Sequence, residues 1–226
     1  MATMLITGAG RGLGLEFARQ YAADGWRVHA CARQPEKAAA LKKLAGEVIT
    51  HRLDVCQGKE IALLQAALAG EAIDVLLNNA GVPGPRGQPI ADIRDEDWLE
   101  VLRVNAIAPL RIASALADNV AKSKLRLMVF ISSQLGSIAR ASAGWHPYRM
   151  SKAALNAGVR VLSLELAGRG ITSVVLHPGW VRTDMGGPGA ALDPATSIAG
   201  MRGVIAGLKP SDNGRFLNYD GAEIPW

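Results

Sequence analysis

The sequence has few of the residues that mark several common classes of protein. Only two of its 226 residues are cysteines and only four are histidines. These are too few, at no recognisable spacing, for a disulfide-stabilised fold or a metal site. No apolar run is long enough to cross a membrane, and the N-terminal residues show no secretory signal. These absences favour a cytoplasmic protein with no membrane segment and no bound metal ion.

Clustered positive charge is also missing, although the net charge is +5. The densest basic stretch holds Lys122, Lys124 and Arg126, in a predicted loop between a helix and a strand. Nucleic-acid binding needs basic residues gathered on one face, so we expect no nucleic-acid partner. A modest positive excess does suit a phosphate-rich cofactor.

Apolar segments of strand and helix length alternate along the chain, and aromatic residues make up only 5% of it. Such alternation predicts a doubly wound parallel α/β sheet with helices on both faces, a Rossmann fold in one domain over residues 1–226. The predicted strands are Met4–Thr7, Arg27–Ala32, Val48–Leu53, Ile73–Leu77, Leu127–Ile131, Ile171–Leu176 and Arg215–Tyr219. The predicted helices are 11–24, one that begins at Pro35, 61–68, one opened by the acidic cluster at 92–97, 147–167 and 194–207.

A glycine-rich turn, T-G-A-G-R-G-L-G at residues 7–14, lies between the first strand and the first helix. Glycine permits positive φ and close backbone contacts, and a helix N-terminus attracts phosphate. This context predicts a site for the pyrophosphate of a dinucleotide. A turn that merely connects the two elements is the alternative.

The end of the second strand bears on which dinucleotide binds. A carboxylate there would bind a ribose 2′-hydroxyl, and an arginine accepts a 2′-phosphate. The sequence has Arg33 and no acidic residue at this point, with Arg11 in the glycine turn as a possible second cation. We therefore expect NADP(H) to be favoured over NAD(H), unless both are ordinary surface arginines.

Tyr148 and Lys152 are four residues apart on a predicted helix, so they share one helix face. An ammonium beside a phenol favours the phenolate and lowers the pKa of the tyrosine. This pair predicts proton transfer by Tyr148, which together with a dinucleotide indicates carbonyl reduction or alcohol oxidation.

Seven stretches, in this order, make the chain resemble the classical short-chain dehydrogenases/reductases, most closely the C-factor/Sniffer-like carbonyl reductase branch. They are T-G-A-G-R-G-L-G (7–14), L-D-V (53–55), N-N-A-G (78–81), Asn105, I-S-S (131–133), Y-R-M-S-K (148–152) and H-P-G-W-V-R-T-D-M (177–185). The resemblance implies a catalytic set of Asn105, Ser133, Tyr148 and Lys152. The cofactor-binding residues that the turn, the second strand and the resemblance predict are Gly8, Arg11, Gly12, Leu13, Gly14, Arg33, Asp54, Val55, Asn79, Ala80, Gly81, Tyr148, Lys152, Pro178, Gly179, Val181 and Thr183.

The resemblance also implies particular roles. Ser133 would hydrogen-bond the substrate carbonyl, with Ser132 as the competing choice. Lys152 would hold the nicotinamide ribose, and Asn105 would hold a water in the proton relay. Pro109 lies four residues after Asn105 and has no N–H, so the Asn105 carbonyl lacks its usual helix partner and is free to bind that water.

Residues 185–208 are glycine-rich and predict a mobile substrate lid over a fairly apolar pocket. The helix after Tyr148 is apolar almost all round, so we expect it to be covered by a second subunit in a homodimer or homotetramer. The predicted function is an NADP(H)-dependent oxidoreductase acting on a small-molecule carbonyl compound or the corresponding alcohol. The alternative is a weakly catalytic NAD(P)-binding protein with a signalling or regulatory role.

Overall fold

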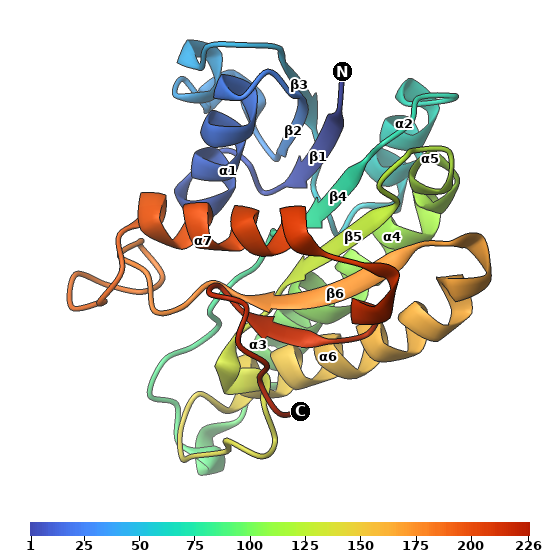
Figure 1. Cartoon of the computed structure of the whole chain (residues 1–226). Coiled ribbons are helices and arrows are strands. Elements are labelled where there is room, and N and C mark those ends of the chain that lie inside the picture. The colour runs from blue at the N-terminus through green and yellow to red at the C-terminus, as the bar shows by residue number, and fades with distance from the viewer.

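A computed structural model describes residues 1–226 and contains a seven-stranded sheet between two layers of helices (Figure 1). The strands lie in the order β3-β2-β1-β4-β5-β6-β7, and every neighbouring pair is parallel. Their bounds are β1 Thr3–Thr7, β2 Arg27–Ala32, β3 Val48–Arg52, β4 Val75–Asn78, β5 Leu127–Ile131, β6 Thr172–His177 and β7 Phe216–Asn218. The predicted Rossmann fold is confirmed.

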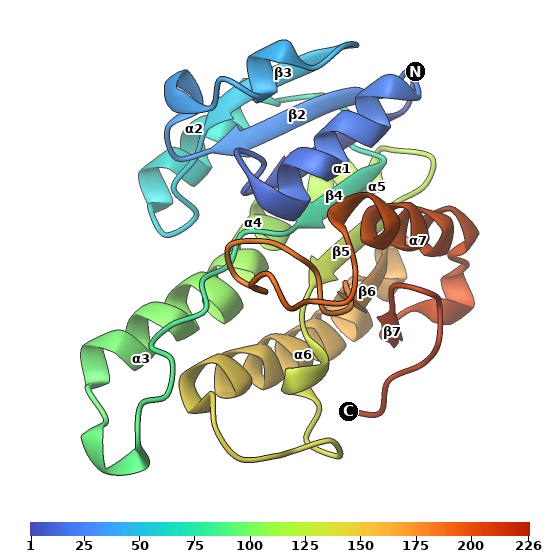
Figure 2. The same cartoon turned by 90° about the vertical axis from the view of Figure 1, so that its left-hand side faces the viewer.

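The helices cover both faces because the parallel strands are apolar on both sides. Their bounds are α1 Gly12–Ala23, α2 Gly58–Ala67, α3 Asp95–Leu102, α4 Ala108–Ala115, α5 Ala117–Ala121, α6 His146–Leu166 and α7 Pro194–Gly207. Helices α1 and α7 pack on one face, where Phe17 and Ile198 share a core cluster. Helices α2, α4 and α6 lie on the other face, where Leu64 and Leu155 share a second cluster (Figures 1 and 2).

The order of the strands reverses between β1 and β4, which are hydrogen-bonded neighbours although β2 and β3 lie between them in the sequence. Ligands of doubly wound sheets bind at such a switch point, beyond the carboxyl ends of the strands. The glycine turn follows β1, Asn79 follows β4 and Ser133 lies just beyond β5. The fold therefore brings the sequence motifs to one edge of the sheet.

The helix predicted to begin at Pro35 does not form. Two short 3-10 turns, Pro35–Lys37 and Leu41–Lys43, take its place. Leu41 is the only residue of these turns that is buried, so little apolar packing holds this segment, and a short helix needs such packing to be stable. Gly46 then closes the segment against the backbone of Ala22, where a Cβ atom would lie 2.5 Å from the carbonyl oxygen.

The helix predicted after the acidic cluster is real but interrupted. Helix α3 passes into a π-helical turn over Arg103–Ile107 and then into α4. Pro109, near the start of α4, cannot donate a hydrogen bond to the Asn105 carbonyl, and the Ala108 N–H instead reaches back to the Arg103 carbonyl. The proline thus changes the helix at the buried Asn105.

Candidate active site

The glycine turn packs tightly against the segment that follows β4. A Cβ atom at Gly8 would lie 2.9 Å from Cα of Ala80, and one at Gly14 would lie 2.3 Å from the Gly8 carbonyl oxygen. Gly12 differs, because its φ is +54° and a Cβ atom there would meet nothing closer than a Thr183 methyl group at 4.0 Å. The turn therefore leaves open space at Gly12, at the N-terminus of α1, where a phosphate is favoured.

Asn79 holds this arrangement together. Its side-chain amide donates to the carbonyl oxygens of Thr7 and Gly8, over 3.0 and 3.2 Å. The Thr7 hydroxyl accepts from the backbone N–H groups of Asn79 and Ala80, over 3.0 and 3.1 Å. The turns after β1 and β4 thus form one rigid unit, as a pre-organised dinucleotide site requires.

The segment after β6 lies opposite the glycine turn. Gly179 has a φ of +81°, and a Cβ atom there would lie 2.4 Å from Leu192. Val181 forms a single parallel bridge with Leu192. This bridge and the hydrogen bond from the Gly186 N–H to the Thr183 hydroxyl, 3.1 Å, fix Thr183 where it faces Gly12.

The segment predicted as a lid has two different parts. Residues 185–193 form an irregular segment with no helix or strand, whereas residues 194–207 form α7. Ile198, Met201 and Ile205 of α7 are buried against the same core as α1. Lid movement therefore remains a prediction only for the residues before Pro194.

The two serines at the end of β5 have different partners. The Ser132 hydroxyl donates to the Asn156 side chain over 2.7 Å inside the protein. The Ser133 hydroxyl accepts the Leu135 N–H over 3.1 Å and lies close enough to Tyr148 to lower its pKa. Only Ser133 thus faces the tyrosine, which favours it over Ser132.

Burial raises the pKa of Tyr148 to about 12, although the Ser133 hydroxyl offsets part of the rise and the residue keeps some exposure. The Lys152 ammonium lies 5.7 Å from the centre of the tyrosine ring and donates to the Ile131 carbonyl oxygen over 2.9 Å. Burial lowers the pKa of Lys152 to about 8. The pKa of Tyr148 is therefore raised rather than lowered as expected, because burial removes hydration from the phenolate and the Ser133 hydroxyl is the group that opposes the rise.

Asn105 is fully buried beside this group. Its side chain accepts from the Val82 N–H and donates to the Val82 carbonyl oxygen, both over 2.8 Å. It also donates to the Ser151 hydroxyl over 3.0 Å, and Ser151 donates to the Tyr148 carbonyl oxygen over 2.8 Å. The Asn105 side chain therefore ties the loop after β4 to helix α6, whatever its carbonyl oxygen binds.

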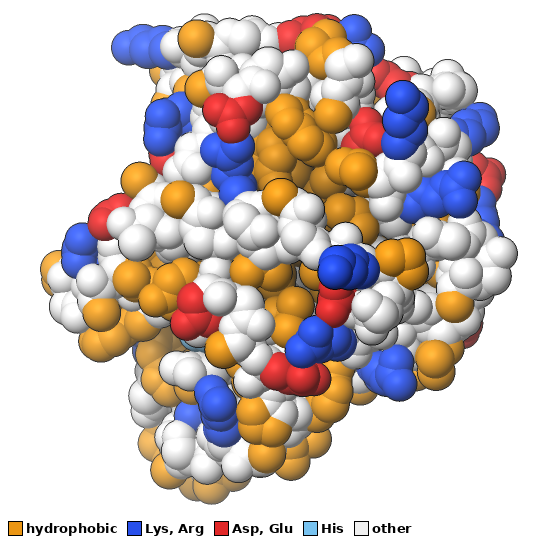
Figure 3. Space-filling view, in the orientation of Figure 1, with side chains coloured by type: hydrophobic (Ala, Val, Ile, Leu, Met, Phe, Trp, Pro, Cys, Tyr) orange, Lys and Arg blue, Asp and Glu red, His pale blue; other side chains and the backbone are white.

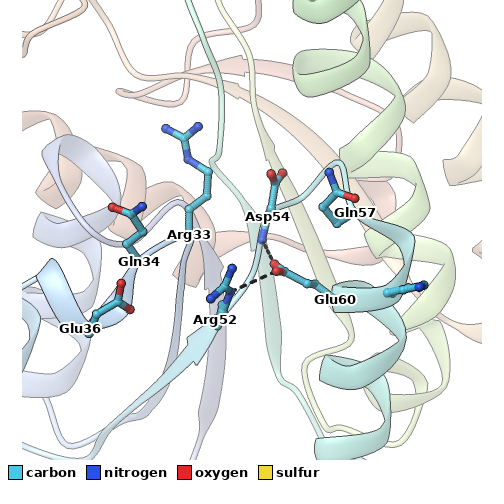
Figure 4. A pocket seen from close by; sticks show the side chains of 8 residues that line it. Arg33, Gln34, Glu36, Arg52, Asp54, Gln57 and Glu60 are labelled. Atoms are coloured by element: carbon cyan, nitrogen blue, oxygen red, sulfur yellow. Dashed lines mark hydrogen bonds and ion pairs between the residues drawn. The ribbon is translucent and has the colours of Figure 1, made fainter.

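A cavity of about 500 Å³ lies at the ends of β2 and β3, and polar and charged side chains line it (Figure 4). Arg33 borders the cavity and makes no ion pair within 4.0 Å with any acidic residue. Asp54 also lines it, and its carboxylate accepts the Cys56 N–H over 2.9 Å. This cavity suits the adenosine end of a dinucleotide, with Arg33 as a free cation.

Some site residues differ from the sequence expectations. Arg11 does not line the cavity of Arg33, since its guanidinium pairs with Asp184 over 3.0 Å. Arg52 does line it but was not expected, because its place beside Arg33 depends on the pairing of β2 with β3. Arg52 is held by Glu60 over 3.1 Å. Val55 and Leu13 contribute mainly apolar packing, to the two core clusters.

The structure contains neither a metal-binding cluster nor a membrane-spanning helix. No group of three or more His, Cys, Asp or Glu side chains is arranged to hold a metal ion. Each of the helices is either too short or too polar to span a membrane. Cys31 and Cys56 are both unpaired.

Comparison with known proteins gives the family. The model of the short chain dehydrogenase family matches residues 2–191. C-signal of Myxococcus xanthus is 45% identical over 155 residues, which make up 68% of this chain and 93% of that protein. Carbonyl reductase Sniffer of D. melanogaster superimposes with a TM-score of 0.91 at 33% identity, covering 100% of both chains. The NADPH-bound carbonyl reductase from chicken fatty liver gives 0.92 at 34% identity, covering 100% of this chain and 99% of that one.

The family model covers the residues that carry the glycine turn and the Ser133–Tyr148–Lys152 group. The chain belongs to the short-chain dehydrogenase/reductase family, in the branch that includes C-signal and Sniffer, and is an NAD(P)-dependent oxidoreductase.

Proposed function

We propose that this oxidoreductase uses NADP(H) to reduce small, fairly apolar carbonyl compounds, or to oxidise the corresponding alcohols. The observation that carries the proposal is the convergence of Ser133, Tyr148 and Lys152 beside Gly81, where a Cβ atom would lie 3.7 Å from the lysine nitrogen. When bound, the dinucleotide supplies or accepts the hydride at the substrate carbon.

The side chains have separable roles in this proposal. With a pKa of about 12, Tyr148 is protonated at neutral pH, which is the state needed to donate a proton to a carbonyl oxygen. Ser133 donates a hydrogen bond to the same oxygen, where negative charge develops. Lys152 holds the nicotinamide ribose and supplies positive charge as the phenolate forms. Asn105 holds the relay water through its backbone carbonyl.

Arg33 is the residue that supports a preference for NADP(H) over NAD(H). Its guanidinium is free of acidic partners and borders a cavity that Arg52 and Lys59 also line, which suits a 2′-phosphate. The chicken carbonyl reductase has NADPH bound, in line with this choice. Replacing Arg33 with Asp should weaken NADPH binding at least about tenfold and improve NADH binding. An unchanged ratio of the two dissociation constants would rule out Arg33 as the determinant.

Self-association is part of the proposal. Met150, Val161 and Leu164 are exposed by 44%, 55% and 62% on one face of α6. The opposite face, with Leu155 and Val159, is buried against the sheet. An exposed apolar stripe along a 21-residue helix fits a second copy of this chain, in a dimer or a tetramer.

Unpaired cysteines are in keeping with the cytoplasm as the location of the protein.

The test is turnover of a panel of aldehydes, ketones and quinones at neutral pH, with NADPH and NADH compared. We expect oxidation of NADPH with at least one class, and slower oxidation of NADH. Tight cofactor binding without turnover of any class would contradict the proposal. It would favour a weakly catalytic NAD(P)-binding protein with a signalling role, a reading for which the name of the C-signal relative gives a precedent.

A further inference from the structure

Arg86 lies in the loop between β4 and α3, which is fixed on both sides of this residue. Before it, both backbone polar groups of Val82 are bound to Asn105, and Gly84 packs so closely that a Cβ atom would lie 2.6 Å from Val101. After it, the Gln88 side chain accepts from the Trp98 ring nitrogen over 3.2 Å. Arg86 is therefore held in place although its side chain is exposed.

The Arg86 guanidinium reaches toward the reaction centre. Its carbon lies 5.2 Å from the centre of the Trp145 ring, in cation–π contact. The Trp145 ring in turn meets the Tyr148 ring edge-on, with 6.1 Å between their centres. One aromatic ring therefore separates Arg86 from the proposed proton donor. Nη2 of Arg86 also donates to the Met185 carbonyl oxygen over 2.7 Å, which joins it to the segment after β6.

Trp145 is held in an unusual backbone conformation. Its φ is +57° and ψ is +34°, and only one other non-glycine residue has a positive φ. A bulky residue in this region is strained, and such strain gathers at functional sites. Arg149 holds the strained turn, because its N–H donates to the Trp145 carbonyl oxygen over 2.8 Å and its Nε donates to the Gly144 carbonyl oxygen over 3.1 Å. The Trp145 indole is thus held in one position between the side chains of Arg86 and Tyr148.

The positive charge of Arg86 is not neutralised by the protein. No acidic side chain lies within 4.0 Å of it, and the nearby Asp184 is already paired with Arg11. The Met185 carbonyl oxygen is the one protein acceptor bound to this guanidinium, so the second N–H of Nη2 remains free beside an N–H of Nε or Nη1. Such a pair of parallel N–H groups matches the two oxygens of a carboxylate.

We propose that Arg86 determines substrate specificity by binding a carboxylate on the substrate, so that the preferred substrates are carbonyl compounds with an apolar body and a carboxylate at the far end. This inference rests on the proposed carbonyl reductase function and names its substrate class. The apolar body would lie along Trp145, and the carbonyl would reach Ser133 and Tyr148. If Arg86 only anchors the segment at Met185, its replacement will change kcat/KM equally for charged and for neutral substrates.

The test compares 4-formylbenzoate and 4-formylcinnamate with their methyl esters, which have the same aldehyde but no charge. In the wild type we expect kcat/KM for the better acid to exceed that for its ester about tenfold, mainly through KM. Arg86→Gln should bring this ratio close to one, and Arg86→Lys should keep part of it. Arg94→Gln, which removes an exposed arginine paired with Asp97, should leave the ratio unchanged.

Binding measurements separate this proposal from the proposed function. Dissociation constants of the same acids and esters are measured by calorimetry with NADP+ bound, where the aldehyde cannot be reduced. A preference for the acid that disappears in Arg86→Gln supports the role of Arg86 even if turnover is absent. No preference in the wild type, or an equal loss for acid and ester in Arg86→Gln, would overturn it.

Discussion

At the residue scale, Ser132 and Ser133 show how neighbouring identical side chains take different tasks. The Ser132 hydroxyl donates a hydrogen bond to the buried Asn156 side chain over 2.7 Å, whereas Ser133 lies next to Tyr148. Ser133→Ala should lower turnover at least about a hundredfold, with little effect on cofactor binding. Ser132→Ala should instead reduce the free energy of unfolding by about 1–3 kcal/mol. Steady-state rates and urea denaturation of both variants measure this, and the reverse pattern would reassign the catalytic serine.

Lys152 carries a pH dependence that stability measurements can detect. Its pKa falls from 10.5 to about 8 on burial, so between these pH values the unfolded chain binds more protons than the folded one. The free energy of unfolding therefore gains a contribution that rises with pH across this window. Relative to Lys152→Met, the wild type should become more stable by about 2 kcal/mol between pH 7.5 and pH 10. Urea denaturation at both pH values tests this, and parallel pH profiles of the two proteins would refute it.

Contacts between residues that are distant in the sequence, and the burial that results from them, could not be predicted from local sequence patterns. The motif Y-R-M-S-K identifies Tyr148 and Lys152 by their helix spacing, but not how deeply the fold buries them. The direction of the tyrosine pKa was therefore missed. Arg86 and Met185 are 99 residues apart, and no local pattern predicts that they meet.

At the element scale, the inner strands could be predicted because they are buried on both faces and form apolar runs. All seven were expected within a few residues of their observed bounds. The segment after Pro35 was not, since it has the composition of a helix but buries only Leu41. Tertiary packing overrides propensity in such short segments. The π-helical turn at Asn105 likewise depends on Pro109 together with packing.

The glycine turn allows a controlled test of the cofactor site. Gly12 and Gly25 both have positive φ, +54° and +78°, and neither position would bring a Cβ atom closer than 4.0 Å to other atoms. Alanine at either position should therefore cost about 1–2 kcal/mol of stability through backbone strain. Only Gly12→Ala should also weaken NADPH binding, by about tenfold or more, because its methyl group enters the space at the start of α1. Equal NADPH affinity in the two variants would place the cofactor elsewhere.

At the scale of the whole molecule, charge and apolar surface are distributed differently. On the face that carries α7, Lys and Arg side chains are scattered among acidic ones, and no continuous basic surface appears there (Figure 3). The exposed apolar residues of α6 instead line up along one helix. This distribution supports the proposed association with another copy of the chain.

Disrupting that stripe should separate the subunits. A charge at Leu164, for instance Leu164→Arg, would lie unpaired in the proposed interface, which strongly disfavours association. Leu63→Arg on α2 is the matched control, since Leu63 is 70% exposed outside this stripe. Light scattering after size-exclusion chromatography should give a single-chain mass for Leu164→Arg and an oligomer for the wild type and the control. A monomeric wild type would contradict the interface.

Proton donation by Tyr148 in an NADP(H)-dependent reduction is tested by comparing NADPH oxidation in the wild type and in Tyr148→Phe. The variant loses only the hydroxyl, so NADPH binding, followed by fluorescence, serves as the control for folding. We predict unchanged NADPH binding with turnover reduced at least about a hundredfold. Turnover within a few-fold of the wild type would show that a group other than Tyr148 delivers the proton.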